Sequence, residues 1–133
     1  MINHILKALM ILMVSTLFLN GCATTQNLLT TGNYSKQTVP NPQTFFKQIW
    51  AVEDDGKFRV SGKLRLKKTS RFHIPNYIEV ALLDQKGVEI ETQKVLYYPR
   101  VLTGRRKKRE ARFSAYFSKT PPSGSIIQLS NVN

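Results

Sequence analysis

Residues that could carry catalysis or bind a metal are few in this chain. It contains one cysteine, Cys22, and two histidines, of which only His73 lies outside the first 21 residues. A zinc site made of His and Cys requires three or four ligands. A Ser–His–acid triad would have to use His73, and Ser70 is merely near this histidine in sequence. We therefore predict a protein that is not an enzyme and that has no catalytic residues, cofactor or metal.

Acidic side chains are equally sparse. Asp54 and Asp55 stand before Gly56, where Asp is favoured because it bonds the backbone of a turn. Glu89 and Glu91 are two positions apart, so on a strand they would share one face, with their side chains about 7 Å apart. Such a pair is more typical of a solvated strand face than of a catalytic acid and base.

Basic residues are the most unusual feature of the composition. Lys and Arg number 20 against 8 Asp and Glu, which gives a formal net charge of +12. One group of cations is consecutive at 105–109, and the other alternates with apolar residues along 57–67. The candidate anion-binding residues are Arg105, Arg106, Lys107, Lys108 and Arg109 in the first group and Lys57, Arg59, Lys63, Arg65 and Lys67 in the second.

The positive field of these cations would attract an anionic partner. Candidates are phospholipid headgroups, the phosphorylated headgroups of lipopolysaccharide, an acidic protein and nucleic acid. Nucleic acid would also need aromatic side chains on which bases stack, and only one of Tyr97 and Tyr98 could serve, because adjacent strand residues face opposite sides. The alternative is a solvated loop and a solvated outer strand face, since Lys also discourages edge-to-edge pairing of sheets.

Cys22 follows an apolar run near the N-terminus. His4 and Lys7 precede residues 8–19, a run of 12 positions that is almost wholly apolar. A helix needs roughly 17–25 such residues to span a bilayer, so the run is typical of the central region of a cleaved secretory signal. This position argues against a buried structural cysteine and against a catalytic thiol.

The residues Leu19-Asn20-Gly21-Cys22 complete the pattern. An apolar, a variable and a small residue precede the cysteine, and glycine has no side chain to obstruct a peptidase. The segment thereby resembles the lipobox of bacterial lipoprotein precursors. The resemblance implies cleavage between Gly21 and Cys22, a diacylglycerol thioether on the Cys22 sulfur, and an acyl chain such as palmitate on its new amino group.

The resemblance also divides the chain. Residues 1–21 are predicted to be the lipoprotein signal peptide, residues 22–43 the lipidated cysteine with a flexible tether, and residues 44–133 a periplasmic domain. The tether is inferred from a composition rich in Thr, Asn, Gln and Pro without a strand or helix period. Asp after the cysteine favours the inner membrane in the enterobacterial sorting pattern, so Ala23 implies anchoring in the outer membrane, facing the periplasm.

From residue 44 onward the hydrophobic period changes to two, which predicts half-buried strands. The clearest is 57–67, and the others are 45–52, 77–84, 88–98, 109–117 and 125–132. A turn at 54–56 joins the first two, and a bulge or bend is expected near Lys94 and Val95. Six to seven strands without an amphipathic helix predict an all-β fold, a small antiparallel β-sandwich of immunoglobulin-like or transthyretin-like type, with an open β-barrel as the alternative.

These features predict a membrane-anchored bacterial envelope lipoprotein whose basic β-sandwich is a non-catalytic binding or assembly module. The alternative is a polyanion- or nucleic-acid-binding accessory lipoprotein of a secretion, conjugation or uptake apparatus. In both cases the lipid on Cys22 makes the membrane one partner, and the second partner is one of the anionic candidates above.

Overall fold

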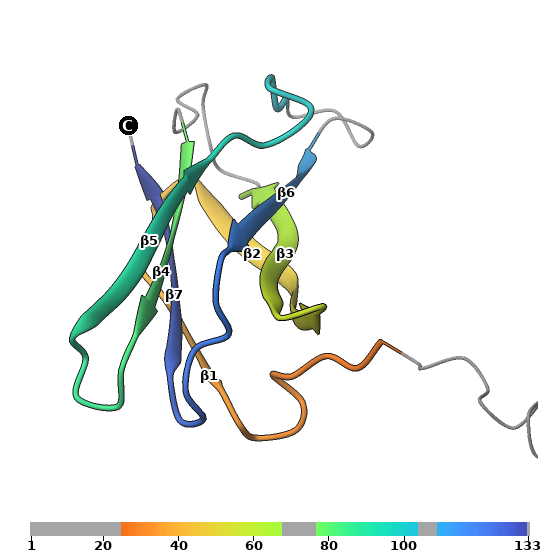
Figure 1. Ribbon diagram of the computed structural model, residues 1–133. Coiled ribbons are helices and arrows are strands. Elements are labelled where there is room, and N and C mark those ends of the chain that lie inside the picture. Colours follow the sequence, from red (N-terminus) through yellow and green to blue (C-terminus); the bar gives the residue numbers. More distant parts are fainter. Residues whose placement is uncertain (1–24, 68–76, 104–108, 133) are drawn as a thin grey trace, which may run out of the picture.

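The computed structural model describes residues 25–67, 77–103 and 109–132, which form two β-sheets packed face to face (Figure 1). The strands are β1 (Ser35–Thr38), β2 (Thr44–Asp54), β3 (Lys57–Leu66), β4 (Tyr77–Leu83), β5 (Glu89–Val95), β6 (Glu110–Phe117) and β7 (Ile126–Val132). The predicted small all-β sandwich is confirmed, and the described strands form no closed barrel. Within these residues there is no helix of the length and apolarity that crossing a membrane requires.

The strand order matches that of an immunoglobulin constant-type sandwich for five strands, but β5 joins β4 in the second sheet, whereas strand D belongs to the first, and among the described residues strand G is missing beside β7. One sheet has the order β2-β3-β6 and the other β1-β7-β4-β5. Counted from β2, the first, second and fifth strands share a sheet and the third pairs with the sixth, as strands A, B, E and C, F do in immunoglobulin domains. Next to β7, where strand G would lie beside F, the chain places β1, which runs parallel to β7.

The hairpin of β2 and β3 forms where the sequence predicts it. Asp55 has φ 50° and Gly56 has φ 74°, and positive φ at both central residues is the requirement of the two-residue turn that matches the twist of a hairpin. Asp54 pairs with Lys57 directly across this turn. The turn thereby fixes which residues of β3 face inward.

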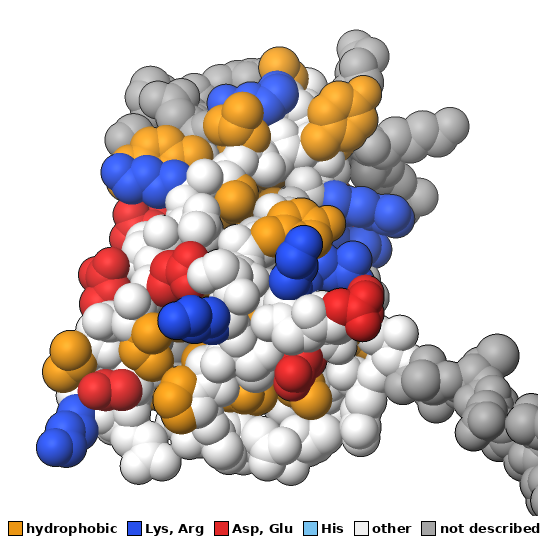
Figure 2. Space-filling model, in the orientation of Figure 1, with side chains coloured by type: hydrophobic (Ala, Val, Ile, Leu, Met, Phe, Trp, Pro, Cys, Tyr) orange, Lys and Arg blue, Asp and Glu red, His pale blue; other side chains and the backbone are white. Residues whose placement is uncertain are grey.

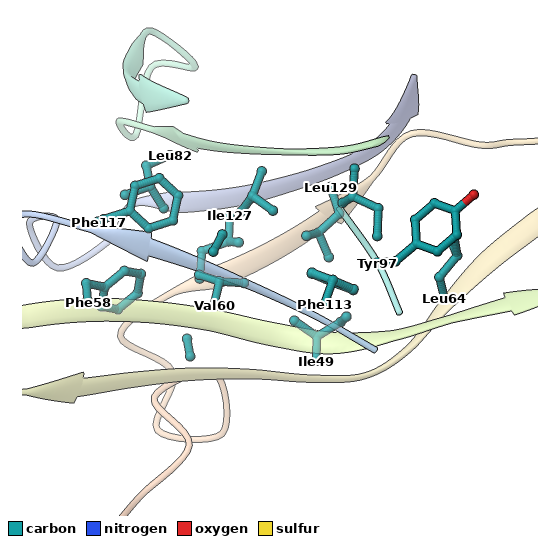
Figure 3. Close-up of a cluster of buried hydrophobic side chains, with 14 of the residues drawn as sticks. Ile49, Phe58, Val60, Leu64, Leu82, Tyr97, Phe113, Phe117, Ile127 and Leu129 are labelled. Atoms are coloured by element: carbon teal, nitrogen blue, oxygen red, sulfur yellow. The ribbon is translucent and has the colours of Figure 1, made fainter. Parts of the chain in front are cut away.

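The core lies between the two sheets, and Figure 3 shows side chains from both meeting there. Alternate residues of β3 and β6 point inward: Phe58, Val60, Leu64, Ala111, Phe113, Ala115 and Phe117 are at most 3% exposed. Ile78, Val80 and Leu82 of β4 and Ile127 and Leu129 of β7 complete the core from the other sheet. Burial of each large apolar side chain is worth about 1.5–3 kcal/mol, so this layer holds the sheets together.

The prediction that residues 22–43 form a flexible tether is wrong for most of the described part of this segment. β1 pairs with β7, Tyr34 is buried in the core, and Leu28 and Leu29 pack against the core. The period of two is missing because all four residues of β1 are exposed on the sheet edge. Backbone hydrogen bonds hold this strand, and they leave no hydrophobic pattern in the sequence.

β5 ends earlier than predicted and its irregularity lies elsewhere. Its register shifts between Glu89 and Glu91, opposite Leu83 and Leu82, and not near Val95, where the strand ends. The extra residue puts the two glutamates on different faces: Glu89 accepts a hydrogen bond from Thr92 Oγ1, and Glu91 accepts one from Gln93 Nε2. The predicted shared face for this pair is therefore wrong, because a bulge reverses the alternation.

Candidate functional site

The outer face of the three-stranded sheet, called here the basic face, carries cations and exposed aromatic side chains. It is formed by Phe45, Lys47 and Trp50 of β2, by Lys57, Arg59, Ser61, Lys63 and Arg65 of β3, and by Glu110, Arg112, Ser114 and Tyr116 of β6. Three of these residues are large and apolar, yet Phe45 is 42%, Trp50 48% and Tyr116 62% exposed. An exposed aromatic set among cations is unlike an ordinary solvated strand face, where apolar residues occur singly.

A bulge in β2 brings Trp50 onto this face. Lys47 pairs with Lys63 and Trp50 with Ser61, so Gln48 and Ile49 together stand opposite a single residue of β3. Gln48 adopts φ 53°, a left-handed conformation that is uncommon outside glycine and that accommodates the extra residue. Without it, positions 47 and 50 would face opposite sides of the sheet, and the Trp50 indole would point into the core.

Gly62 of β3 lies opposite the bulge in β2 and makes the bulge possible. Ile49, the second residue of the bulge, is buried, and a Cβ on Gly62 would collide with Ile49 Cδ1 and come within 3.2 Å of the Phe113 ring. The glycine thus provides the space in which Ile49 enters the core. Trp50 is turned outward as a direct consequence.

Two neighbouring cross-strand rows make up the centre of the basic face. Lys47, Lys63 and Arg112 form one row across β2, β3 and β6, and Trp50, Ser61 and Ser114 form the next. The short serine side chains leave a shallow hollow beside the Trp50 indole, bordered by Lys63 and Arg112. The arrangement offers an aromatic surface and two cations around one small depression.

The charge of the first row is only partly neutralised. Lys63 Nζ lies 3.3 Å from Glu110 Oε1, an ion pair with both side chains about one third exposed or less. A second shallow hollow, lined by Lys63, Glu110, Arg112 and Tyr98, adjoins this pair. Tyr98 is 80% exposed and its backbone pairs with Arg112, whereas Tyr97 is buried, so the predicted opposite orientation of the two tyrosines is confirmed.

Half of the acidic residues lie away from the basic face. Figure 2 shows Lys and Arg gathered at the right of the view, over β6 and β3, with hydrophobic side chains beside them. Four of the acidic residues lie on the hairpin of β4 and β5 in the other sheet: Glu79, Asp84, Glu89 and Glu91. On the basic face itself the acids are Glu110 and, at the end of β2, Asp54.

The predicted anion-binding residues fall into three groups. Lys57, Arg59, Lys63 and Arg65 share the basic face, as the alternation predicts, and Lys67 continues their register but donates from Nζ to Asn41 O at 2.7 Å. Arg109 is half-buried beside Leu66, whose N–H donates to Arg109 O, and it does not belong to the face. Arg105, Arg106, Lys107 and Lys108 lie outside the described residues, as do Cys22, Ser70 and His73.

Lys47, Arg112 and the aromatic residues were not predicted as part of a site. The sequence of β6 indicates that Arg112 and Tyr116 face outward, because they alternate with the inward-facing residues of the strand. For Trp50 no signal was available, because simple alternation does not reveal a bulge.

The chain joins the domain at the edge of β2, beside the basic face. Asn27 Nδ2 donates to Ile49 O at 3.2 Å, its Oδ1 accepts from Ala51 N at 3.0 Å, and Leu28 N donates to Ala51 O at 2.8 Å. Thr25, Gln26 and Leu28 line a hollow together with Val52, Lys57, Arg59 and Tyr116 of the face and with Glu53 and Asp54 at the end of β2. Val52, which lies in an outward position next to this segment, is only 4% exposed.

Comparison of the chain with protein-family models, with curated protein sequences and with solved structures finds no match. Among residues 25–67, 77–103 and 109–132 no three His, Cys, Asp or Glu side chains are grouped as metal ligands would be.

Proposed function

We propose that the protein is a membrane-anchored bacterial envelope lipoprotein, lipidated on Cys22 and facing the periplasm from the outer membrane, whose sandwich is a non-catalytic module that binds an anionic partner. The observation that carries the binding half is the row Lys47–Lys63–Arg112 beside the exposed Trp50. Three cations in one row repel each other, and an anionic partner would relieve that repulsion.

The anchoring half rests on the lipobox-like residues Leu19-Asn20-Gly21-Cys22. Acyl chains contribute about 0.8 kcal/mol for each buried methylene, so two or three chains hold a protein stably in a bilayer. Growth with labelled palmitate should label the wild type and leave Cys22→Ser unlabelled and at precursor size. Equal labelling of the two proteins would contradict the anchoring proposal.

The binding half is tested with heparin as a generic polyanion. The triple variant Lys47→Gln, Lys63→Gln, Arg112→Gln should elute from immobilised heparin at lower salt than the wild type, because it lacks the cations that release counterions on binding. The matched control is Lys36→Gln, Lys86→Gln, Lys94→Gln, which removes the same charge from exposed positions of the other sheet and its β4–β5 turn. Equal elution of the two variants would show that net charge alone governs retention.

One observation favours the alternative, a nucleic-acid-binding accessory of a secretion, conjugation or uptake apparatus. Bases stack on exposed aromatic side chains among cations, and Trp50, Tyr98 and Tyr116 are exposed in this way. Under this alternative Trp50→Ala should weaken binding of a single-stranded oligonucleotide more than binding of heparin, which has no bases. Equal weakening would speak against stacking.

A further inference from the structure

We propose that the basic face lies on the anionic surface of the bilayer into which the Cys22 lipid inserts. This inference rests on the proposed lipidation and deepens the binding proposal by naming phospholipid headgroups as the partner. It is carried by three observations on the described residues: where the chain joins the domain, how little chain remains before Cys22, and which side chains the face presents.

The first observation is the point of attachment. The segment 25–28 lies at the edge of β2 that faces away from β3, close to the β2–β3 turn and next to Val52, Arg59 and Tyr116 of the three-stranded sheet. Asn27 fixes it by hydrogen bonds to Ile49 and Ala51. In Figure 1 this N-terminal segment lies beside the hairpin of β2 and β3. A pull on the lipid anchor is therefore applied to the sheet that carries the cations.

The second observation is the length of chain between anchor and attachment. Asn27 is five residues from Cys22, and five residues span at most about 18 Å when fully extended. The predicted tether of residues 23–43 would have reached about 70 Å, but its later part belongs to the sandwich. The attachment point beside Trp50 is thus held close to the headgroups, and the high local concentration favours contact with them.

The third observation is the chemistry of the face. Trp and Tyr are enriched at membrane interfaces because their rings are apolar with a polar group, and Trp50 and Tyr116 are exposed on this face. The row of Lys47, Lys63 and Arg112 adjoins the Trp50 row on one side, and the row of Arg59 and Tyr116 adjoins it on the other, so these cations would meet lipid phosphates beside the aromatic rings. The acids of the β4–β5 hairpin belong to the other sheet and would be kept away from the anionic surface.

A single-stranded nucleic acid fits the same side chains but not the attachment. The link of at most about 18 Å keeps the attachment point, and a polymer bound on the face beside it, close to the bilayer, where anionic lipids repel a polyanion. The lipid surface itself is attracted by the same cations. The short link therefore favours the bilayer over a polymer as the partner.

Trp50 is the single tryptophan of the chain, so its fluorescence reports on this face alone. The lipidated full mature protein is reconstituted into vesicles of phosphatidylethanolamine and phosphatidylglycerol that contain lipids brominated near the headgroup. We expect a blue-shifted Trp50 emission, quenching by the brominated lipid and protection from acrylamide in the aqueous phase. The triple variant Lys47→Gln, Lys63→Gln, Arg112→Gln should lose much of the bromolipid quenching, and the control Lys36→Gln, Lys86→Gln, Lys94→Gln should keep it.

Trp50 that stays open to acrylamide and unquenched by bromolipid, in protein that carries the lipid and sediments with the vesicles, would overturn the docking inference and leave the anchoring proposal standing. Trp50 emission that changes only when an oligonucleotide is added would also overturn it and assign the face to nucleic acid. Absence of lipid on Cys22 would appear separately in the palmitate experiment and would overturn both proposals.

Discussion

Asn27 holds the main chain on both sides of Trp50, since its side-chain amide donates to Ile49 O at 3.2 Å and accepts from Ala51 N at 3.0 Å. The residues that it binds belong to the edge of β2 that has no strand partner among the described residues. Leu28 N adds a further bond, to Ala51 O. One asparagine thus closes the sheet edge, fixes the N-terminal segment and stabilises the bulge that turns the indole outward.

Replacing this asparagine should release the segment. Asn27→Ala leaves Ala51 N and Ile49 O without their side-chain partner, which should lower the free energy of unfolding by about 1–2 kcal/mol. Urea unfolding measures this, and hydrogen exchange at the Ala51 amide should speed up. The control is Thr30→Ala, whose exposed hydroxyl bonds only Asn27 O and should change stability by less than about 0.5 kcal/mol. Unchanged exchange at Ala51 would contradict the role given to Asn27.

Gly62 should be required for the stability of the domain, because the Ile49 side chain occupies the space beside it. Gly62→Ala places a methyl group against Ile49 Cδ1 in the core, and overpacking of this kind costs about 1–3 kcal/mol. Ile49→Val removes that methyl group and alone should cost about 0.5–1.5 kcal/mol. The double variant should be more stable than the sum of the single effects, as measured by urea unfolding. Strict additivity would show that the two residues do not share the space.

β1 should behave as a strand and not as a linker. Val39 N donates to Leu129 O at 2.9 Å, so Val39→Pro removes a hydrogen bond to β7 and should cost about 1–2 kcal/mol. Lys36→Pro is the control, because the Ser35 and Val39 N–H groups face β7 and alternation directs that of Lys36 away from it. Equal stability of the two variants would mean that residues 35–39 form a tether, as the sequence predicts, and not a strand.

The sequence predicted those parts of the fold in which a local pattern and the tertiary structure agree. Alternation along β3 and β6 gave the correct inward set, because both strands have one buried and one exposed face. The Asp-Gly turn gave the correct hairpin. β3 and β6 together carry a large share of the core and most of the basic face.

The parts of the fold and of the basic face that were not predicted depend on interactions that leave no pattern in the sequence. Asn27 and Ala51 are 24 residues apart, and a single side-chain amide links them. The sequence of β1 is like that of a linker, because its four residues are exposed and only their backbone is bound to β7. Trp50 was assigned to a strand but not to a surface, because the left-handed Gln48 and the extra residue of the bulge are set by the space over Gly62.

Tyr34 should make the free energy of unfolding depend on pH in the alkaline range. Its hydroxyl donates to Pro121 O at 2.7 Å, and burial in the first place, with the charge of Glu53 second, raises the pKa of Tyr34 above 10.0. The unfolded chain then loses this proton at a lower pH than the folded protein. The contribution of Tyr34 is therefore complete below pH 10 and falls as the pH rises through its folded-state pKa.

Tyr34→Phe should lower the free energy of unfolding by about 1–2 kcal/mol at neutral pH, because Pro121 O loses a buried donor. Its difference from the wild type should shrink above pH 10, where the wild type loses the contribution of the protonated phenol. Urea unfolding at pH 7 and at several values above 10 measures both effects. Tyr116→Phe, altered at a position that is 62% exposed, is the control and should follow the wild type throughout. A constant difference between Tyr34→Phe and wild type at all pH values would mean that the Tyr34 hydroxyl does not titrate with unfolding.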